Sequence, residues 1–441
     1  MNKNIESKKQ NHLMFVPIAF FIICIIFFVI NNKASLKTFW IGGFFSMFLA
    51  FVLTQNKGEF GEKCIQHLKN NVLINCIIIF VLAGILSSIL KSTGVSNAFL
   101  MLFINMGIDV RFFPLIVFII CCLVSTSIGT STGTISMAVP IFLPLTTIIN
   151  CNPALILGAI VCGSFFGDNL SPISDTTIIS INTMKVELYE TLKQRAKISL
   201  ICFGLSCIVY IILGYYFIPN NTIVLEYNYS LSPLVMMLTF IIMAILLIKK
   251  KDIISVLLVC DMAAIVIAVL FGFINIEELL CSNSCIVTGI EGVFGVIIFW
   301  IFLFILTGFI PEETLENIAN KNLKSEKKSN FLGIAIIILS VLMVANNTAA
   351  MSLISKFINK CFKNKTQIEK ANIFDGLSCA VPGLLPYNTA FMLMISMAYD
   401  TGCISQNFSV FLILLFSVNS IFLLIFYIIL ALRKSKTYKI S

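Results

Sequence analysis

Long apolar runs follow one another along almost the whole chain. Each run has about 18 or more residues with few charges, the length that a helix needs to cross a bilayer. The polar connectors between them are too short to enclose a core of their own. The plain runs predict membrane-spanning helices over 13–30, 36–54, 72–90, 198–218, 231–248, 253–272, 286–310 and 408–432.

Two further apolar regions, 112–184 and 331–399, are each interrupted twice by polar residues, Gly or Pro. A backbone in lipid cannot leave its hydrogen bonds unmade, so such interruptions should face protein or water. We therefore predict broken helices whose ends meet near the middle of the membrane. The interruptions lie at 125–134, 167–177, 345–350 and 382–389.

The two interrupted regions agree in order and spacing. Aligning Thr132 with Thr348 needs a shift of 216 residues, and aligning Asp175 with Asn388 needs 213. The plain runs shift similarly, which predicts two structural repeats of roughly 215 residues. The expected units are a first transmembrane repeat over 1–218, an external linker over 219–230 and a second transmembrane repeat over 231–441.

The charges indicate how the chain is oriented. Of its 441 residues 59% are hydrophobic and 12% charged, and the net charge is +9. The basic residues are dispersed among short connectors, which argues against nucleic acid as a partner. If 112–150 and 331–358 are re-entrant hairpins, 25 of the 30 Lys and Arg residues lie on one side, together with both termini. We expect that side to be the cytoplasm.

This arrangement gives each repeat about five crossings, an odd number, so the second repeat should be inverted relative to the first. The expected fold is an all-α polytopic membrane protein with two inverted repeats, each with a re-entrant hairpin and a broken helix. Such repeats are typical of secondary transporters. A composition rich in Lys, Asn and Ile points to an AT-rich bacterial genome, and hence to a bacterial inner membrane, with lipid as the surrounding partner.

The stretch GDNLSPISDTT at 167–177 holds the first candidate chemistry. Pro172 prevents a continuous helix, and Gly167 permits a bend. A buried carboxylate at Asp175 would hold either a proton or a small cation. The alternative is that Asp175 caps a half-helix that Thr176 and Thr177 open. Hard cations prefer oxygen ligands, which this stretch offers at Ser171, Ser174 and Thr176.

Other polar residues extend the candidate set. Asp168 is either a second proton site or a cap at the cavity rim. Asn388 is either an oxygen ligand, which makes it with Asp175 a candidate for binding Na⁺, or a satisfied polar bridge. The seven hydroxyls within 125–134 either complete an oxygen shell at a hairpin tip or let helices pack closely. The remaining candidates are Thr130, Thr132, Asn347 and Thr389.

Two charged features are expected to be structural. Asp375 precedes Gly376 near the predicted inner end of its span, where capping a helix is its expected role. KVELYETLKQRAK at 185–197 is expected to be a surface connector.

GSFFGDNLSPISDTT at 163–177 resembles the signature of the NhaC family of Na⁺/H⁺ antiporters, within the ion transporter superfamily. VPGLLPYNTA (381–390) and SIGTSTGTISMAVP (127–140) resemble the matching family segments, with Tyr387 and Thr132 where the family usually has Trp. The resemblance covers about residues 70–430. It implies that inward movement of H⁺ drives Na⁺ out, with these ions as cargo and no cofactor. NhaC-like relatives also include exchangers of organic acids, such as malate with lactate.

Four functions compete. The leading one is a Na⁺(Li⁺)/H⁺ antiporter that exchanges cytoplasmic Na⁺ for external H⁺ by alternating access. The alternative is a Na⁺- or H⁺-coupled exchanger of organic acids or amino acids. It would want a cationic ligand, yet the only arginine of the broken regions is Arg111 at their edge, although half-helix N-termini could substitute. An enzyme is disfavoured because His12 and His67 both lie in connectors. A channel is disfavoured by the repeats, and a homodimer is left open.

Overall fold

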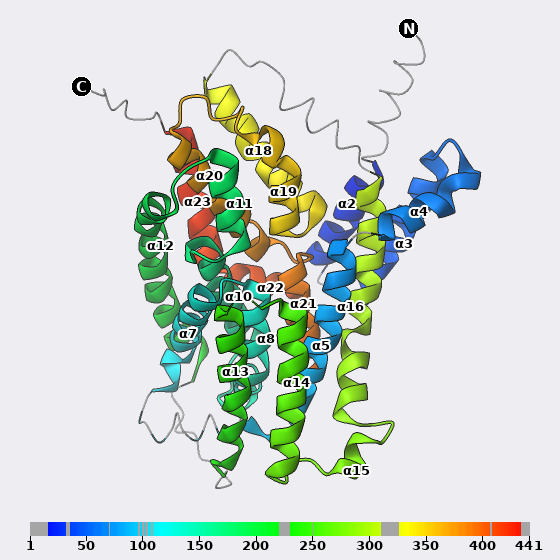
Figure 1. Cartoon of the computed structure of the whole chain (residues 1–441), viewed down its shortest axis with the longest axis vertical. Coiled ribbons are helices and arrows are strands. Elements are labelled where there is room, and N and C mark those ends of the chain that lie inside the picture. The colour runs from blue at the N-terminus through cyan, green and yellow to red at the C-terminus, as the bar shows by residue number, and fades with distance from the viewer. Residues whose placement is uncertain are drawn as a thin grey trace.

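The computed structural model describes residues 16–31, 36–69, 71–95, 98, 101, 105, 107, 109–219, 230–249, 251–309, 326–405 and 408–433. Its regular elements in these residues are helices, packed into an upright bundle (Figure 1). Eight helical spans in the described part of the chain are long and apolar enough to cross a membrane, or nine with one bent pair. The prediction of an all-α polytopic membrane protein is confirmed, whereas the inverted relation of the two halves stays a prediction.

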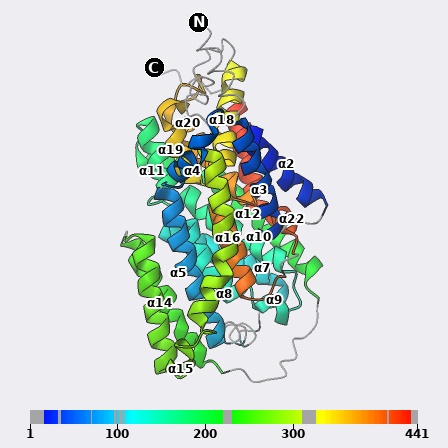
Figure 2. The ribbon, with the colours of Figure 1, turned by 90° about the vertical axis from the view of Figure 1, so that its right-hand side faces the viewer.

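The plain helices follow the hydropathy runs to within a few residues at most ends. In Figure 2, α14 and α15 stand on one side of the bundle and α2 and α3 on the other. The external linker at 219–230 and the two chain ends fall almost wholly outside the described residues. The plain helices are α2 (Val16–Ile30), α3 (Leu36–Leu53), α5 (Asn71–Thr93), α12 (Leu188–Phe217), α13 (Met237–Ile248), α14 (Ile253–Leu270) and α16 (Cys285–Gly308), with the short α4 (Phe60–Leu68) and α15 (Ile276–Leu279) between them.

All four predicted interruptions are confirmed as breaks between helices. The first region holds α7 (Phe113–Ile128), α8 (Ser131–Phe142), α9 (Leu145–Ile148), α10 (Pro153–Leu170) and α11 (Asp175–Met184). The second holds α18 (Glu326–Val344), α19 (Asn347–Ile358), α20 (Gln367–Ala380) and α21 (Thr389–Asp400). In Figure 1, α11 and α19 occupy the upper half and α8 and α21 the lower half, so the breaks meet at mid-height.

The spacing of the breaks matches the predicted repeat. Helices α8 and α19 begin 216 residues apart, at Ser131 and Asn347, and α11 and α21 begin 214 apart, at Asp175 and Thr389. The best register therefore sets Ser174 rather than Asp175 against Asn388, because both residues are the N-caps of their half-helices.

The expected plain span over 408–432 is wrong in one respect. Helices α22 (Val410–Phe416) and α23 (Val418–Leu432) meet at Ser417 with a bend of 60°. The carbonyl of Phe416, next to the bend, accepts a hydrogen bond from the Tyr210 hydroxyl at 2.9 Å. In a straight helix this carbonyl would accept a hydrogen bond from a backbone N–H of the next turn. At the bend, the Tyr210 hydroxyl of α12 donates to it instead.

The expected surface connector over 185–197 is also wrong, because α12 already begins at Leu188. Thr191, Arg195 and Ser199 are fully buried. They lie four residues apart and so share one face of the helix. The charged residues around them gave this stretch the look of a solvated surface, which concealed that one buried face.

Gly167 does not bend its helix, since α10 continues to Leu170. A Cβ atom at Gly167 would lie 1.9 Å from the Oγ of Ser125 on α7. The glycine therefore allows close contact between two helices rather than a kink.

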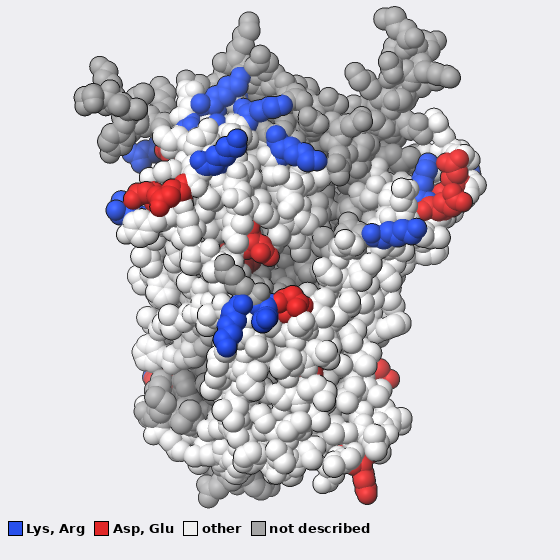
Figure 3. Space-filling model, viewed as in Figure 1, with Lys and Arg blue, Asp and Glu red and all other residues white. Residues whose placement is uncertain are grey.

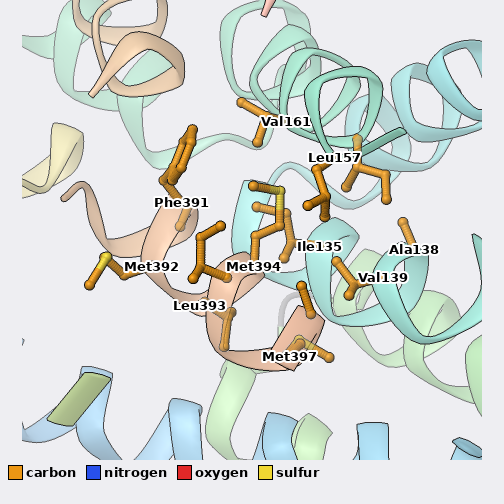
Figure 4. Close-up of a cluster of buried hydrophobic side chains, with 14 of the residues drawn as sticks. Ile135, Ala138, Val139, Leu157, Val161, Phe391, Met392, Leu393, Met394 and Met397 are labelled. Atoms are coloured by element: carbon orange, nitrogen blue, oxygen red, sulfur yellow. The ribbon is translucent and has the colours of Figure 1, made fainter. Parts of the chain in front are cut away.

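Apolar side chains fill the space between α8, α10 and α21 (Figure 4). This group, the lower apolar cluster, comprises Ile135, Ala138, Val139, Leu157, Val161, Phe391, Met392, Leu393, Met394 and Met397. None of these side chains has an oxygen or nitrogen atom. They lie on α8 and α21, which begin at breaks, and on α10, which ends at one.

Candidate ion-binding site

A cavity of about 900 Å³ lies where the four half-helices begin. Its walls include the first residue of each, namely Ser131 of α8, Asp175 of α11, Asn347 of α19 and Thr389 of α21. The first N–H groups of a helix have no partner within it and carry a partial positive charge. The cavity is therefore a polar space in which four helix N-termini converge.

The cavity opens between α4 and α19. Gln66 and Lys69 at the end of α4 and Ser352 of α19 are exposed and also line it. In Figure 3, Lys and Arg side chains gather over this upper end of the molecule, a second group of charged side chains lies near mid-height, and only isolated acidic side chains lie below it. Since the lower apolar cluster packs α8 and α21 together, the opening faces one end of the bundle.

Asp168, near the end of α10, is the buried carboxylate of this cavity. Its side chain is 5% exposed, and its Oδ2 lies 3.4 Å from the Nδ2 of Asn347. Ser131, the first residue of α8, lines the same cavity. The backbone carbonyl of Asp168 accepts a bond from the Thr176 hydroxyl at 2.9 Å. Asp168 is thus bonded to the beginnings of α11 and α19 and shares its cavity with the beginning of α8.

Asp175 lines the same cavity but is exposed to it. The residue that caps α11 is Ser174, and Asp175 follows it as the first helical residue, so the capping interpretation of Asp175 is wrong. Ser174 and Thr176 both line the cavity, with their hydroxyl oxygens 3.0 Å apart. Ser171 is buried outside the lining and accepts a 3.4 Å bond from the backbone of Ile173.

Asn388 is fully engaged in structure. Its Oδ1 accepts a bond from the Ala390 N–H at 3.0 Å, which caps α21, and its Nδ2 donates to the Ala345 carbonyl at 2.9 Å. Thr389, which lines the cavity, donates to the same carbonyl at 3.1 Å. Asn388 lies outside the cavity lining, and its role as a Na⁺ ligand stays a prediction.

The hydroxyls of 125–134 divide into two groups. Thr130, Ser131 and Thr132 line the cavity, and the side-chain oxygens of the two threonines lie 2.9 Å apart. The other four donate to backbone carbonyls, so three of the seven hydroxyls belong to the cavity lining. These four are Ser125, Thr126, Ser127 and Thr134.

The structure adds an ion pair that the sequence did not reveal. Arg195 Nη1 of α12 lies 2.9 Å from Asp375 Oδ2 of α20, and both side chains are fully buried. Asp375 sits in the interior of α20, so the expected capping role is wrong. The spacing of Thr191, Arg195 and Ser199 was the one available signal, because it places polar residues on a single face of α12.

Two further basic residues, Arg111 and His67, lie near the broken regions. Arg111 forms an ion pair with Asp109 at 2.5 Å and lies over the ring of Tyr215. Its hydrogen bonds lower the pKa of the Asp109 carboxyl below the usual range. His67 lies in α4 and lines the cavity, where burial lowers the pKa of its imidazole.

Comparison with known proteins bears on the first half of the chain. The model of the Na⁺/H⁺ antiporter family matches residues 8–217. The predicted resemblance is confirmed. The matched segment contains both candidate carboxylates, Asp168 and Asp175, with the break between them.

Three relatives agree with this match. The chain is 34% identical over 154 residues to an uncharacterized Na⁺/H⁺ antiporter of Haemophilus influenzae, covering 32% of each protein. It is 26% identical over 141 residues to the Na⁺/H⁺ antiporter NhaC of Alkalihalophilus pseudofirmus, covering 32% of this chain and 30% of the relative. It is 24% identical over 136 residues to the malate-2H⁺/Na⁺-lactate antiporter of Bacillus subtilis, covering 29% of each. The matches thus span about a third of each relative.

Proposed function

We propose that this protein is a secondary transporter, not an enzyme, that exchanges Na⁺ or Li⁺ for H⁺ across a membrane. One observation carries the proposal: a buried carboxylate, Asp168, faces a polar cavity at the point where broken helices meet. A charged carboxylate in that setting is costly unless a proton or a cation joins it. Proton and cation therefore compete for one group, which is the requirement for exchange.

The neighbouring groups suit a small hard cation. Asn347 offers an amide oxygen, and Ser131, Thr130 and Thr132 offer hydroxyls around the same cavity. Oxygen ligands of this kind suit hard cations. Asp175, exposed on the cavity wall, would raise the local cation concentration before an ion reaches Asp168.

An exchanger of organic acids is the second candidate. The cavity volume lies within the range of about 300–1,000 Å³ typical of small-molecule sites, and helix N-termini attract anions. The malate–lactate antiporter among the relatives adds support. Against it, both arginines near the broken helices are already engaged, Arg195 with Asp375 and Arg111 with Asp109. We therefore favour the cation.

The proposed setting is a bacterial inner membrane with both chain ends in the cytoplasm. Basic connectors crowd one side of the predicted topology, which supports that orientation. The open end of the cavity would then face the cytoplasm, and alternating access would expose Asp168 to the other side. External H⁺ would enter as cytoplasmic Na⁺ leaves.

Everted vesicles carrying a pH-sensitive dye test the proposal. Respiration acidifies the vesicles, and Na⁺, Li⁺, K⁺, malate and lactate are then added separately. We expect Na⁺ and Li⁺ to dissipate the proton gradient only when the protein is present. A response to malate or lactate alone would favour the second candidate, and no response to any of them would contradict both.

A further inference from the structure

We propose that the buried Arg195–Asp375 ion pair sets the charge balance of the Asp168 site, acting as a positioning unit outside the cavity. The inference rests on the proposed exchange and identifies a determinant of its pH dependence. Neither residue lines the cavity, so neither is a ligand for the transported ion. Their two charges cancel each other, and the pair lies beside Asp168, whose carboxylate gains and loses charge in the proposed exchange.

The pair is held in a dense polar network. Arg195 donates to the Asn372 side chain at 3.0 Å, to the Asn169 carbonyl at 2.9 Å and to the Thr177 hydroxyl at 2.9 Å. A further bond from Arg195 reaches Ser180 at 3.2 Å. These partners come from α10, α11 and α20. A single guanidinium therefore connects both sides of the break between α10 and α11 to α20 in the second broken region. The guanidinium is planar and donates several hydrogen bonds at once, so its orientation is fixed.

The network reaches Asp168 by two short routes. Asn169, the next residue along α10, donates to Asp375 Oδ2 at 2.8 Å. Thr176 donates to the Asp168 carbonyl at 2.9 Å, and the Cys379 thiol lies 3.6 Å from the Thr176 hydroxyl and 3.8 Å from Asp375 Oδ2. Asp375 is thus connected to Asp168 through Asn169 on one route and through Cys379 and Thr176 on the other. In a low-dielectric interior a change of charge on the pair must act on Asp168.

The charges around Asp168 show what the pair does. Asp375 and the buried Cys379 thiol lie 3.8 Å apart on α20, and Arg195 of α12 pairs with Asp375. Asp175 shares its cavity from α11. The contacts from α8 and α19, described above, are uncharged. With Arg195 and Asp375 cancelling, the buried site carries one negative charge, which one proton or one monovalent cation neutralises.

The test measures Na⁺-dependent proton release in everted vesicles across a series of pH values, for variants of the pair. Asp375→Asn leaves Arg195 positive, which favours ionised Asp168, so the half-maximal pH should fall. Arg195→Gln removes the cation that keeps Asp375 ionised; at the pH values where Asp375 stays negative, it disfavours charge on Asp168, so the half-maximal pH should rise. Each shift should be on the order of one pH unit. The double variant Arg195→Gln/Asp375→Asn should return to the wild-type value.

A merely structural role predicts something different. It would lower activity in every variant without moving the half-maximal pH in opposite directions. Shifts of the same sign, no shift, or a double variant that stays displaced would each overturn the proposal. If one single variant fails to reach the membrane, the other decides it, because a structural role alone predicts no shift of its half-maximal pH. Absence of exchange in the wild type would contradict the proposed function instead.

Discussion

The two broken regions, α7 to α11 and α18 to α21, share one backbone plan and differ in chemistry. The half-helices of the first repeat bring Asp168 and Asp175 to the cavity, whereas those of the second bring Asn346 and Asn347. In the proposed exchange, the first broken region supplies the charge that a proton or a cation neutralises. The second supplies amides, which keep their hydrogen bonds at any pH.

The two broken regions also differ in how tightly their helices pack. Helix α7 packs closely on α10, and a Cβ at Gly163 or Gly167 would lie within 2.4 Å of an α7 side chain. Helix α18 makes a much smaller contact with α20. The carboxylate therefore sits on the more rigid half, where its position is best defined.

The largest effect should come from removing the buried charge. Asp168→Asn retains the shape and can still meet Asn347, but it cannot exchange a proton for a cation. We expect Na⁺/H⁺ exchange in vesicles to fall by about 100-fold or more. Exchange above a tenth of the wild-type rate would show that the difference in charge between the two broken regions is not functional.

Gly167→Ala tests the close packing of the first hairpin. The added methyl group must displace Ser125, so we expect a loss of about 2 kcal/mol of stability. The thermal unfolding of purified protein in detergent measures this loss. Gly204→Ala on α12 is the matched control, because its Cβ meets nothing within 4 Å. Equal unfolding temperatures for the two variants would contradict the packing argument.

Asp175→Asn should have a smaller effect than Asp168→Asn, because Asp175 is exposed on the cavity wall. We expect the apparent KM for Na⁺ to rise by roughly threefold to tenfold with exchange retained, as befits a charge that attracts ions. The effect should weaken at higher ionic strength. Complete loss of exchange would restore Asp175 to the central role that the sequence suggested.

Asn388→Ser should have the smallest effect on transport. Serine keeps the cap of α21 and loses only the bond to the Ala345 carbonyl, which costs about 1 kcal/mol of stability. The apparent KM for Na⁺ should stay within about twofold of the wild-type value. A rise comparable to that of Asp175→Asn would support Asn388 as a Na⁺ ligand.

The sequence predicted what local chemistry determines. Pro172 and the polar stretches around it located the breaks, and the hydropathy runs located the plain helices. Eight of the ten candidate residues line the cavity; Ser171 and Asn388 do not. Which aspartate is buried depends on how α10 packs against α8 and α19, and no local pattern encodes that.

The pairing of Arg195 with Asp375 was beyond sequence analysis for the same reason. The two residues lie 180 positions apart and meet only because α12 packs on α20. The bend at Ser417 likewise depends on a bond from Tyr210, on another helix.

The lower apolar cluster bears on how well the protein would prevent ions from leaking across the membrane. A cation that slipped between α8 and α21 would lose its hydration shell among hydrocarbon and thioether groups that offer nothing in exchange. If the protein is the carrier we propose, the packing that closes one end of the cavity would also prevent an ion leak through it and so preserve the membrane voltage. Three methionines, Met392, Met394 and Met397, suit this barrier, because unbranched side chains can refit after the helices have moved.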